Sequence, residues 1–295
     1  MEVSRSSVGG PGTEIHEFDP NTATDEDFVT IAKTVYTEKI VVLKNQDLTP
    51  RGFVDLGRRF GQPEPYYEPM YHHPSDHNIF VSGNLQQQSG NVGVPKTGQF
   101  WHADYQFMRR PFGLTLVYPQ ILPKANRGTY FIDMGRAYEK LSVGTRADIV
   151  GTRSSHSVRD YFKIRPADVY RPVVEVMRDI ERATPAVSHP TTFQHPVTGE
   201  TVLYNSEGFT FAITDGAGHR IGGDLLRRVL GETGQLDRSF QHDNIHLQVY
   251  ESGDLIIWDN RSLIHRALHN TTAEPAVSYR VTVHDDHPFY RGIDG

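Results

Sequence analysis

Two polar residues interrupt an aromatic segment of the sequence. In "GQFWHADYQFMRRP", residues 98–111, one alanine separates His102 from Asp104. A histidine and a carboxylate at this spacing are either a polar pair on the wet face of a strand or two ligands of a metal ion. His265 offers a third ligand shortly after the strand-like run "DLIIWDN" at 254–260. Two imidazoles and one carboxylate on one face of iron(II) leave three positions open, as in non-haem oxygenases.

Arg280 follows the third candidate ligand, in the strand-like run "SYRVTV". Two open positions on the iron can chelate a 2-oxo acid, and a planar guanidinium can bind the far carboxylate of 2-oxoglutarate bidentately. Thr129, in "RGTYFID", offers a hydroxyl to the same carboxylate. Zinc could bind the same three ligands. The arginine after the second histidine favours a 2-oxo acid co-substrate and O₂ over hydrolytic zinc chemistry.

Composition excludes several other classes of site. The chain of 295 residues has no cysteine, which rules out disulfides, thiolate metal sites and a cysteine nucleophile. Its net charge of −6 argues against nucleic acid or an anionic membrane as the main partner. The sequence has no apolar run of membrane-spanning length and no apolar signal-peptide core, so we expect a cytoplasmic protein.

The elements that must position these residues are mostly short strands. Thr49 and Pro50 predict the start of a helix that ends at Gly61, Asp133 predicts the cap of a helix through "MGRAYEKL", and a further helix is expected at 222–232. Strands are expected at 38–46, 78–84, 113–119, 128–133, 201–206, 209–214, 246–250, 254–260 and 277–286. Many short strands with few helices predict a double-sheet jelly roll with helical decoration.

The chain shows no clear linker. Its Ser, Gly and Pro content predicts a loose tail at residues 1–12, followed by a single domain at 13–295. Residues 140–200 mix helix-like pieces with several prolines, and we interpret them as an insert in that domain.

Four segments, "WHAD", "GTYFID", "WDNRSLIHRA" and "YRVTV", carry a family resemblance. From residue 38 to 286, the chain resembles the taurine dioxygenase-like family of iron(II)/2-oxoglutarate oxygenases. The resemblance implies a double-stranded β-helix, a variant of the jelly roll. It also implies that His102, Asp104 and His265 bind iron, and that Thr129 and Arg280 bind the side chain of 2-oxoglutarate.

A narrower resemblance concerns the substrate. It implies an isonitrile-forming oxidative decarboxylase that acts on an N-carboxymethyl-3-amino acid, a glycine adduct of a short or fatty acyl chain, in natural-product biosynthesis. Phe107 is expected to form an apolar wall over the iron. The residues that carry the narrower resemblance, and that it implies in substrate binding, are Tyr66, Tyr67, Tyr71, Lys163, Arg165 and His269.

The sequence around Lys163 and Arg165 also indicates an anionic substrate. Arg165 precedes Pro166, which favours an extended backbone, so the side chains of Lys163 and Arg165 should point to one side. Two cations on one side suit a substrate with carboxylates, although "KIRP" is otherwise typical of a solvated turn and the tyrosines of half-buried packing.

Alternatives of two kinds stay open. One is a simple hydroxylase of the same family that acts on a small carboxylate or sulfonate, and the other is a non-catalytic jelly-roll protein that binds a small acid. Isonitrile formation removes four electrons, so it should consume two 2-oxoglutarate and two O₂. The sequence leaves open the acyl chain length, delivery by a carrier protein and assembly into a homo-oligomer.

Overall fold

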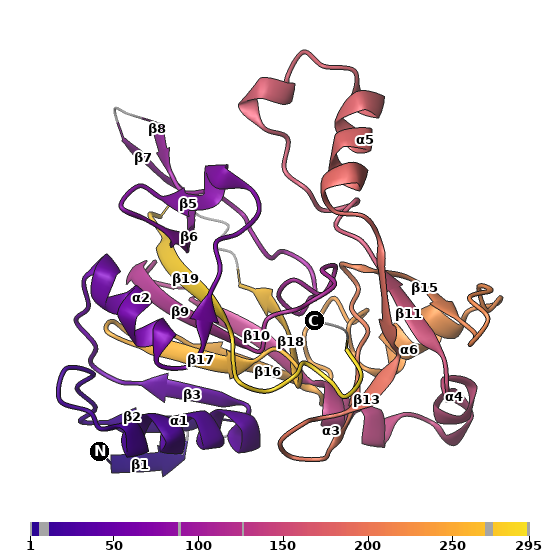
Figure 1. Ribbon diagram of the computed structural model, residues 1–295, viewed down its shortest axis with the longest axis horizontal. Coiled ribbons are helices and arrows are strands. Elements are labelled where there is room, and N and C mark those ends of the chain that lie inside the picture. The colour runs from indigo at the N-terminus through magenta and orange to yellow at the C-terminus, as the bar shows by residue number, and fades with distance from the viewer. Residues whose placement is uncertain (1, 6–11, 88–89, 126, 269–273, 294–295) are drawn as a thin grey trace.

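The structure is a computed structural model, and it describes residues 2–5, 12–87, 90–125, 127–268 and 274–293. Two sheets facing each other form its centre (Figure 1). In the described part of the chain the larger sheet has nine strands, antiparallel except for one parallel pair, β2 with β3. Its order is β1 (Glu2–Arg5), β2 (Thr13–His16), β3 (Ile40–Leu43), β17 (Leu255–Asp259), β9 (Leu114–Ile121), β19 (Val277–His284), β6 (Asp76–Gly83) and β5 (His72–His73), with β4 (Gln62–Pro63) beside β19.

The smaller sheets complete the jelly roll. The one that matters most for the site has the order β16 (Ile245–Val249), β10 (Gly128–Asp133) and β18 (Leu263–Ala267). A second has the order β12 (Val187–Pro190), β11 (Arg153–His156) and β15 (Thr210–Thr214). Two hairpins pair β13 (Thr192–Gln194) with β14 (Thr201–Leu203), and β7 (Leu85–Gln87) with β8 (Gly90–Val92).

Alternation along the strands explains why the central strands are apolar throughout. On β3, Val41 and Leu43 join the core under the helices, whereas Ile40 and Val42 face Phe131 on β10. Successive side chains of a strand point to opposite faces, so a strand covered on both faces is apolar at every position. The space between the two sheets is therefore the interior into which polar side chains of β9, β10, β18 and β19 can point.

Two helices cover the outer face of the larger sheet. They are α1 (Asp25–Glu38), which packs on β3 and β17, and α2 (Pro50–Arg58), which packs on β6 and β19. Thr49 caps α2 as predicted: its hydroxyl accepts a hydrogen bond from the Gly52 amide, and Pro50 occupies the first turn. Helix α1 was not predicted, although Thr24 and Asp27 form a capping box at its start.

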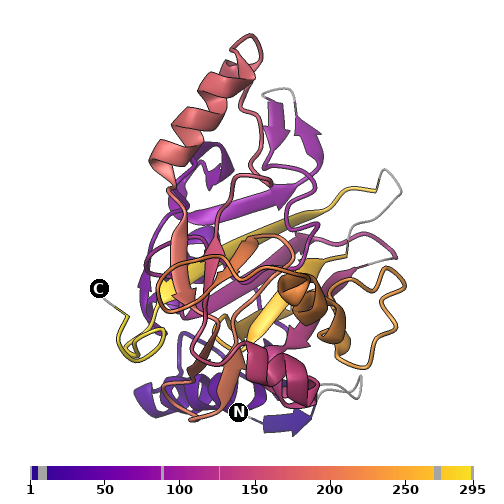
Figure 2. The same cartoon turned by 90° about the vertical axis from the view of Figure 1, so that its right-hand side faces the viewer.

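A projecting arm includes residues 166–183. Helix α5 (Val173–Ala183) stands at the top of the molecule in both views (Figures 1 and 2). The short turn η2 (Pro166–Asp168) precedes it. The remaining helical elements lie closer to the sheets and are η1 (Pro69–Tyr71), α3 (Met134–Lys140), α4 (Val143–Asp148) and α6 (Leu225–Glu232).

The predicted strands are all present, with ends that shift by a few residues. The Asp133 side chain caps α3 as expected, by accepting from the amides of Gly135 and Arg136. The structure differs from the expected loose tail at Glu2–Arg5, which pair with β2. None of the helices in the described part of the chain combines the length and hydrophobicity needed to cross a bilayer.

Candidate metal centre

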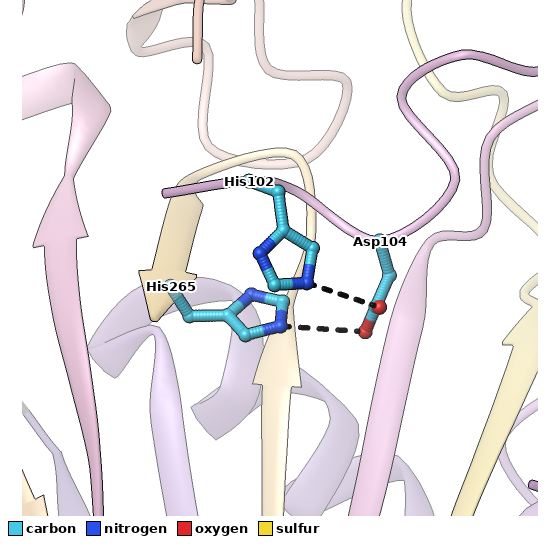
Figure 3. A group of neighbouring side chains, drawn as sticks. All are labelled: His102, Asp104 and His265. Carbon is cyan, nitrogen blue, oxygen red and sulfur yellow. Dashed lines mark ion pairs between the residues drawn. The ribbon is translucent and has the colours of Figure 1, made fainter. Parts of the chain in front are cut away.

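The three predicted metal ligands lie together between the two sheets (Figure 3). His102 forms a β-bridge with His265, in which each amide donates to the other residue's carbonyl, at 3.0 and 2.7 Å. Asp104 follows two residues later. One ligand atom from each of the three side chains lies within 4.8 Å of the others, and all three side chains are buried. The backbone bridge therefore fixes the spacing of the two imidazoles.

The two imidazoles present the same edge to the carboxylate. Nε2 of His102 lies 4.0 Å from Oδ1 of Asp104, and Nε2 of His265 lies 3.8 Å from Oδ2 (Figure 3). Nδ1 of His102 is 2.9 Å from the Phe100 carbonyl, which can only accept, so Nδ1 carries the proton. The lone pair of His102 is then on Nε2 and faces the centre of the site.

Burial sets the protonation of the histidines. It lowers the pKa of His102, against the opposing charge of Asp104, and lowers the pKa of His265 well below its ordinary value, with His102 adding to the effect. Both rings are therefore neutral near pH 7. A neutral imidazole has the free lone pair that a metal requires.

Asp104 is held as an anion by two neighbours. The Thr115 hydroxyl donates to Oδ2 at 2.7 Å, and a guanidinium nitrogen of Arg280 donates to Oδ1 at 2.5 Å. Burial would raise the pKa of Asp104, but Arg280, followed by the two histidines and Thr115, more than offsets this and lowers it. Two neutral imidazoles and one carboxylate are the donor set of a mononuclear non-haem iron site.

Arg280 and Thr129 line one cavity but lie in different surroundings. The Arg280 guanidinium lies 4.0 Å from the centre of the Phe80 ring and 5.5 Å from that of Tyr105. Its Nε is buried and has no hydrogen-bond partner among the described residues, so it can still donate to a ligand. Thr129 instead accepts a 2.5 Å hydrogen bond from the Tyr250 hydroxyl. Its own proton is then available to a carboxylate.

A cavity of about 1220 Å³ opens beside the ligands. Its walls include Phe107 and Phe209, whose ring centres are 4.8 Å apart. The charged residues of its lining are mostly basic, in a chain whose net charge is negative. The cations are Lys96, Arg127, Lys163, Arg238, Arg266 and Arg280, and the anions are Asp104, Asp160 and Glu207. An excess of cations favours anionic ligands.

The predicted tyrosines form one aromatic cluster. Tyr66 and Tyr71 line the cavity, with ring centres 5.0 Å apart. The Tyr67 ring packs at a tilt against that of Tyr66, with centres 4.5 Å apart, and also contacts Phe107, but it is not part of the cavity lining. Burial raises the pKa of Tyr66 well above its ordinary value, so its hydroxyl stays protonated and acts as a neutral hydrogen-bonding group.

The expected pair of cations is separated. Lys163 lines the cavity, where its ammonium donates to the Lys96 carbonyl at 3.2 Å. Arg165 lies outside the lining and donates to the Asp168 carboxylate at 2.7 Å. Pro166 begins η2, and Asp168 also accepts from the Arg165 amide, so this turn folds the guanidinium back onto its own segment. His269 lies outside the described residues.

Three residues of the site, Thr115, Tyr250 and Tyr105, were not predicted from the sequence. Thr115 is the one small polar residue in the otherwise apolar run "GLTLVY", which is the signal that could have found it. Tyr250 lies just past the end of β16, and a strand end carries no distinct signal. Tyr105, whose left-handed backbone has φ of 59°, packs its ring against Tyr66 and Phe112.

Comparisons with known proteins agree with this geometry. The family described as "Taurine catabolism dioxygenase TauD, TfdA family" matches residues 4–282. Pentalenolactone F synthase of Streptomyces arenae is 27% identical over 259 residues, which cover 85% of this chain and 84% of that protein. The alpha-ketoglutarate-dependent 2,4-dichlorophenoxyacetate dioxygenase of Cupriavidus pinatubonensis is 23% identical over 269 residues, which cover 87% and 88%.

Solved structures share the fold. AAD-2 in complex with Mn(II) and N-oxalylglycine superposes with a TM-score of 0.75 at 19% identity, over 98% of this chain and 100% of that one. A putative alpha-ketoglutarate-dependent taurine dioxygenase from Burkholderia xenovorans gives a TM-score of 0.73 at 21% identity, over 97% and 90%. The jelly-roll prediction is confirmed.

Proposed function

Because the chain belongs to the TauD/TfdA family of iron(II)- and 2-oxoglutarate-dependent dioxygenases, we propose that it converts an N-carboxymethyl-3-amino acid to the isonitrile with loss of CO₂. The observation that carries the proposal is the basic, tyrosine-lined cavity beside the three ligands. It offers Lys163, Arg280, Tyr66 and Tyr71 to carboxylates. A substrate with two carboxylates, bound together with 2-oxoglutarate, suits this excess of cations.

The metal ligands in this proposal are His102, Asp104 and His265. Iron(II), with 2-oxoglutarate and O₂ as co-substrates, supplies the oxidising equivalents that remove hydrogen from the N–CH₂ group. The protein holds the ligand set through the bridge between the histidines and keeps Asp104 ionised through Thr115 and Arg280. The buried aromatic walls formed by Phe107 and Phe209 exclude water from the reacting group.

In this proposal the carboxylates of 2-oxoglutarate and of the substrate bind to different cationic side chains. Arg280 and the Thr129 hydroxyl bind the far carboxylate of 2-oxoglutarate in this proposal, and Lys163 binds a substrate carboxylate near the cavity rim. Tyr66 and Tyr71 orient the substrate by neutral hydrogen bonds, and Tyr67 supports the ring of Tyr66. Holding the target C–H close to the metal is what the protein contributes beyond the chemistry of the iron.

The overall stoichiometry follows from electron balance. Conversion of R–NH–CH₂–COO⁻ to R–N≡C and CO₂ releases three protons and four electrons. Each 2-oxoglutarate that is decarboxylated to succinate with one O₂ accepts two of those electrons. One isonitrile therefore requires two 2-oxoglutarate and two O₂, and this ratio separates the proposal from hydroxylation.

The test is product analysis with the iron-loaded protein, 2-oxoglutarate and N-carboxymethyl-3-amino acids of graded chain length. Mass spectrometry should detect an isonitrile and two succinates per product, and parallel assays with carrier-bound thioesters show in which form the substrate is used. Simple hydroxylation is the second candidate, because a 2,4-dichlorophenoxyacetate dioxygenase is among the relatives. An alcohol with one succinate would establish it, and no 2-oxoglutarate consumption would indicate a non-catalytic binding protein.

A further inference from the structure

Glu207 lies between the two chain segments that carry the candidate histidines. Its Oε2 is 3.4 Å from the amide of Trp101, the residue before His102. The same oxygen is 3.5 Å from a guanidinium nitrogen of Arg266, the residue after His265. One carboxylate thus contacts the immediate neighbours of both histidines.

The glutamate is itself fixed in place. Its other oxygen accepts from Arg238 at 2.8 Å, and its amide donates to the Gln235 side chain at 2.7 Å. The next residue, Gly208, donates its amide to the Trp101 carbonyl at 2.9 Å. A Cβ at this glycine would overlap the Phe100 ring, so the loop packs directly on the segment that leads to His102. These contacts hold Glu207 in a fixed position against the segment that leads to His102.

The ion pair between Glu207 and Arg266 is largely shielded from solvent. The side chain of Glu207 is 13% exposed and that of Arg266 is 20% exposed, so little solvent screens their attraction. Loss of the carboxylate would leave two arginines facing each other at the cavity wall, with only repulsion between them. That repulsion would displace Arg266 and, through the backbone, His265.

We infer that Glu207 is a positioning residue for the metal centre, which holds the His102 and His265 segments at the spacing that the metal requires. It acts through Trp101 and Arg266 and does not touch the metal itself. The inference rests on the proposed ligand roles of His102 and His265. Groups that orient metal ligands typically change metal affinity by about tenfold or more when they are removed.

The experiment measures Mn(II) affinity by isothermal titration calorimetry, without substrate. Glu207→Ala should bind Mn(II) about tenfold more weakly than wild type. Glu207→Gln keeps an oxygen of the same reach but loses the charge, and Glu207→Asp keeps the charge but is one methylene too short to reach all its partners. Each should therefore lose part of the Mn(II) affinity that Glu207→Ala loses. Using Gln and Asp keeps the test valid if the alanine variant does not fold.

Glu181→Gln is the matched control. Glu181 pairs with Arg159 at 3.6 Å on the projecting arm, away from the metal ligands. The substitution should therefore leave Mn(II) affinity unchanged. Wild-type affinity in all folded Glu207 variants would overturn the inference, as would a lower melting temperature with no change in affinity. His102→Ala tests the underlying site separately: if it binds Mn(II) like wild type, the ligand assignment fails, whatever Glu207 does.

Discussion

The guanidinium of Arg280 lies 2.5 Å from the carboxylate of Asp104, between the two sheets. Both side chains are buried, so each charge needs its partner. Alternation on β19 produces the contact, because Val281 and Val283 face the helix-covered core while Arg280 faces the opposite way. Arg280 therefore has two uses: it keeps Asp104 ionised, and its unpartnered Nε can donate to a carboxylate that enters the cavity.

The first prediction concerns Arg280→Ala. Loss of a charge-assisted hydrogen bond costs about 1.5–3 kcal/mol, so half-saturation by 2-oxoglutarate should require at least tenfold more co-substrate. Metal affinity should not fall, because the substitution also removes a competitor for Asp104, and a bound metal cation would itself keep that carboxylate ionised in place of Arg280. Anaerobic titration of the iron-loaded protein, followed by its visible charge-transfer band, measures the 2-oxoglutarate affinity. Unchanged 2-oxoglutarate affinity, with a higher substrate KM, would place Arg280 on the substrate carboxylate instead.

The second prediction concerns Tyr250→Phe. The Tyr250 hydroxyl donates to Thr129 and so directs the threonine proton away from Tyr250 and toward the cavity. Without this bond the Thr129 hydroxyl can rotate, and the net value of one neutral hydrogen bond is about 1 kcal/mol. The 2-oxoglutarate KM should rise about fivefold, while Mn(II) affinity stays constant. A Thr129→Val variant that is more affected than Tyr250→Phe would support this order of action, and an unchanged KM in both variants would exclude Thr129 from the pocket.

The third prediction compares Lys163→Met with Arg165→Gln. Lys163 lines the cavity, so removal of its charge should raise the substrate KM about tenfold or more and leave the 2-oxoglutarate KM unchanged. Arg165 donates a hydrogen bond to Asp168, and this bond lowers the pKa of Asp168 to about 2. Because the guanidinium is already paired in this way, Arg165→Gln should change the substrate KM much less. Steady-state kinetics of both variants decide the matter. An equal, large rise in both would mean that η2 rearranges when substrate binds.

The sequence predicted what alternation and capping determine. The apolar runs predicted β3 and β17, and the Thr49-Pro50 and Asp133 caps predicted the starts of α2 and α3, because these signals are local. The order His-x-Asp, His predicted three residues that the fold brings within 4.8 Å. The three residues meet because His265 lies on β18 and a backbone bridge ties the His102 segment to it.

Contacts between residues far apart in the sequence were not predicted. The extended backbone before Pro166 predicted Lys163 and Arg165 on one side, but Asp168 competes for the guanidinium, and no spacing rule weighs that competition. The role of Thr115 depends on the pairing of β9 with β17 and β19, which determines the face of the sheet that it occupies. The contacts of Glu207 join its own loop to three other segments, at Trp101, at 235–238 and at Arg266, which are far apart in the sequence.

The fourth prediction concerns pH and His189, which is buried in the second small sheet. Its Nδ1 is 2.9 Å from the Tyr290 hydroxyl and its Nε2 is 2.9 Å from the Met108 carbonyl, and burial lowers its pKa from 6.5 to about 4. Between these values the unfolded chain binds the proton and the folded chain does not. The stability contribution is therefore complete above about pH 6.5 and is lost as the pH falls through about 4, by about 3 kcal/mol. Urea unfolding at pH 7 and pH 4 should show that His189→Gln, which can keep both hydrogen bonds, loses about 3 kcal/mol less than wild type on acidification. Equal losses in the two proteins would mean that His189 already has this pKa in the unfolded chain or is protonated in the fold.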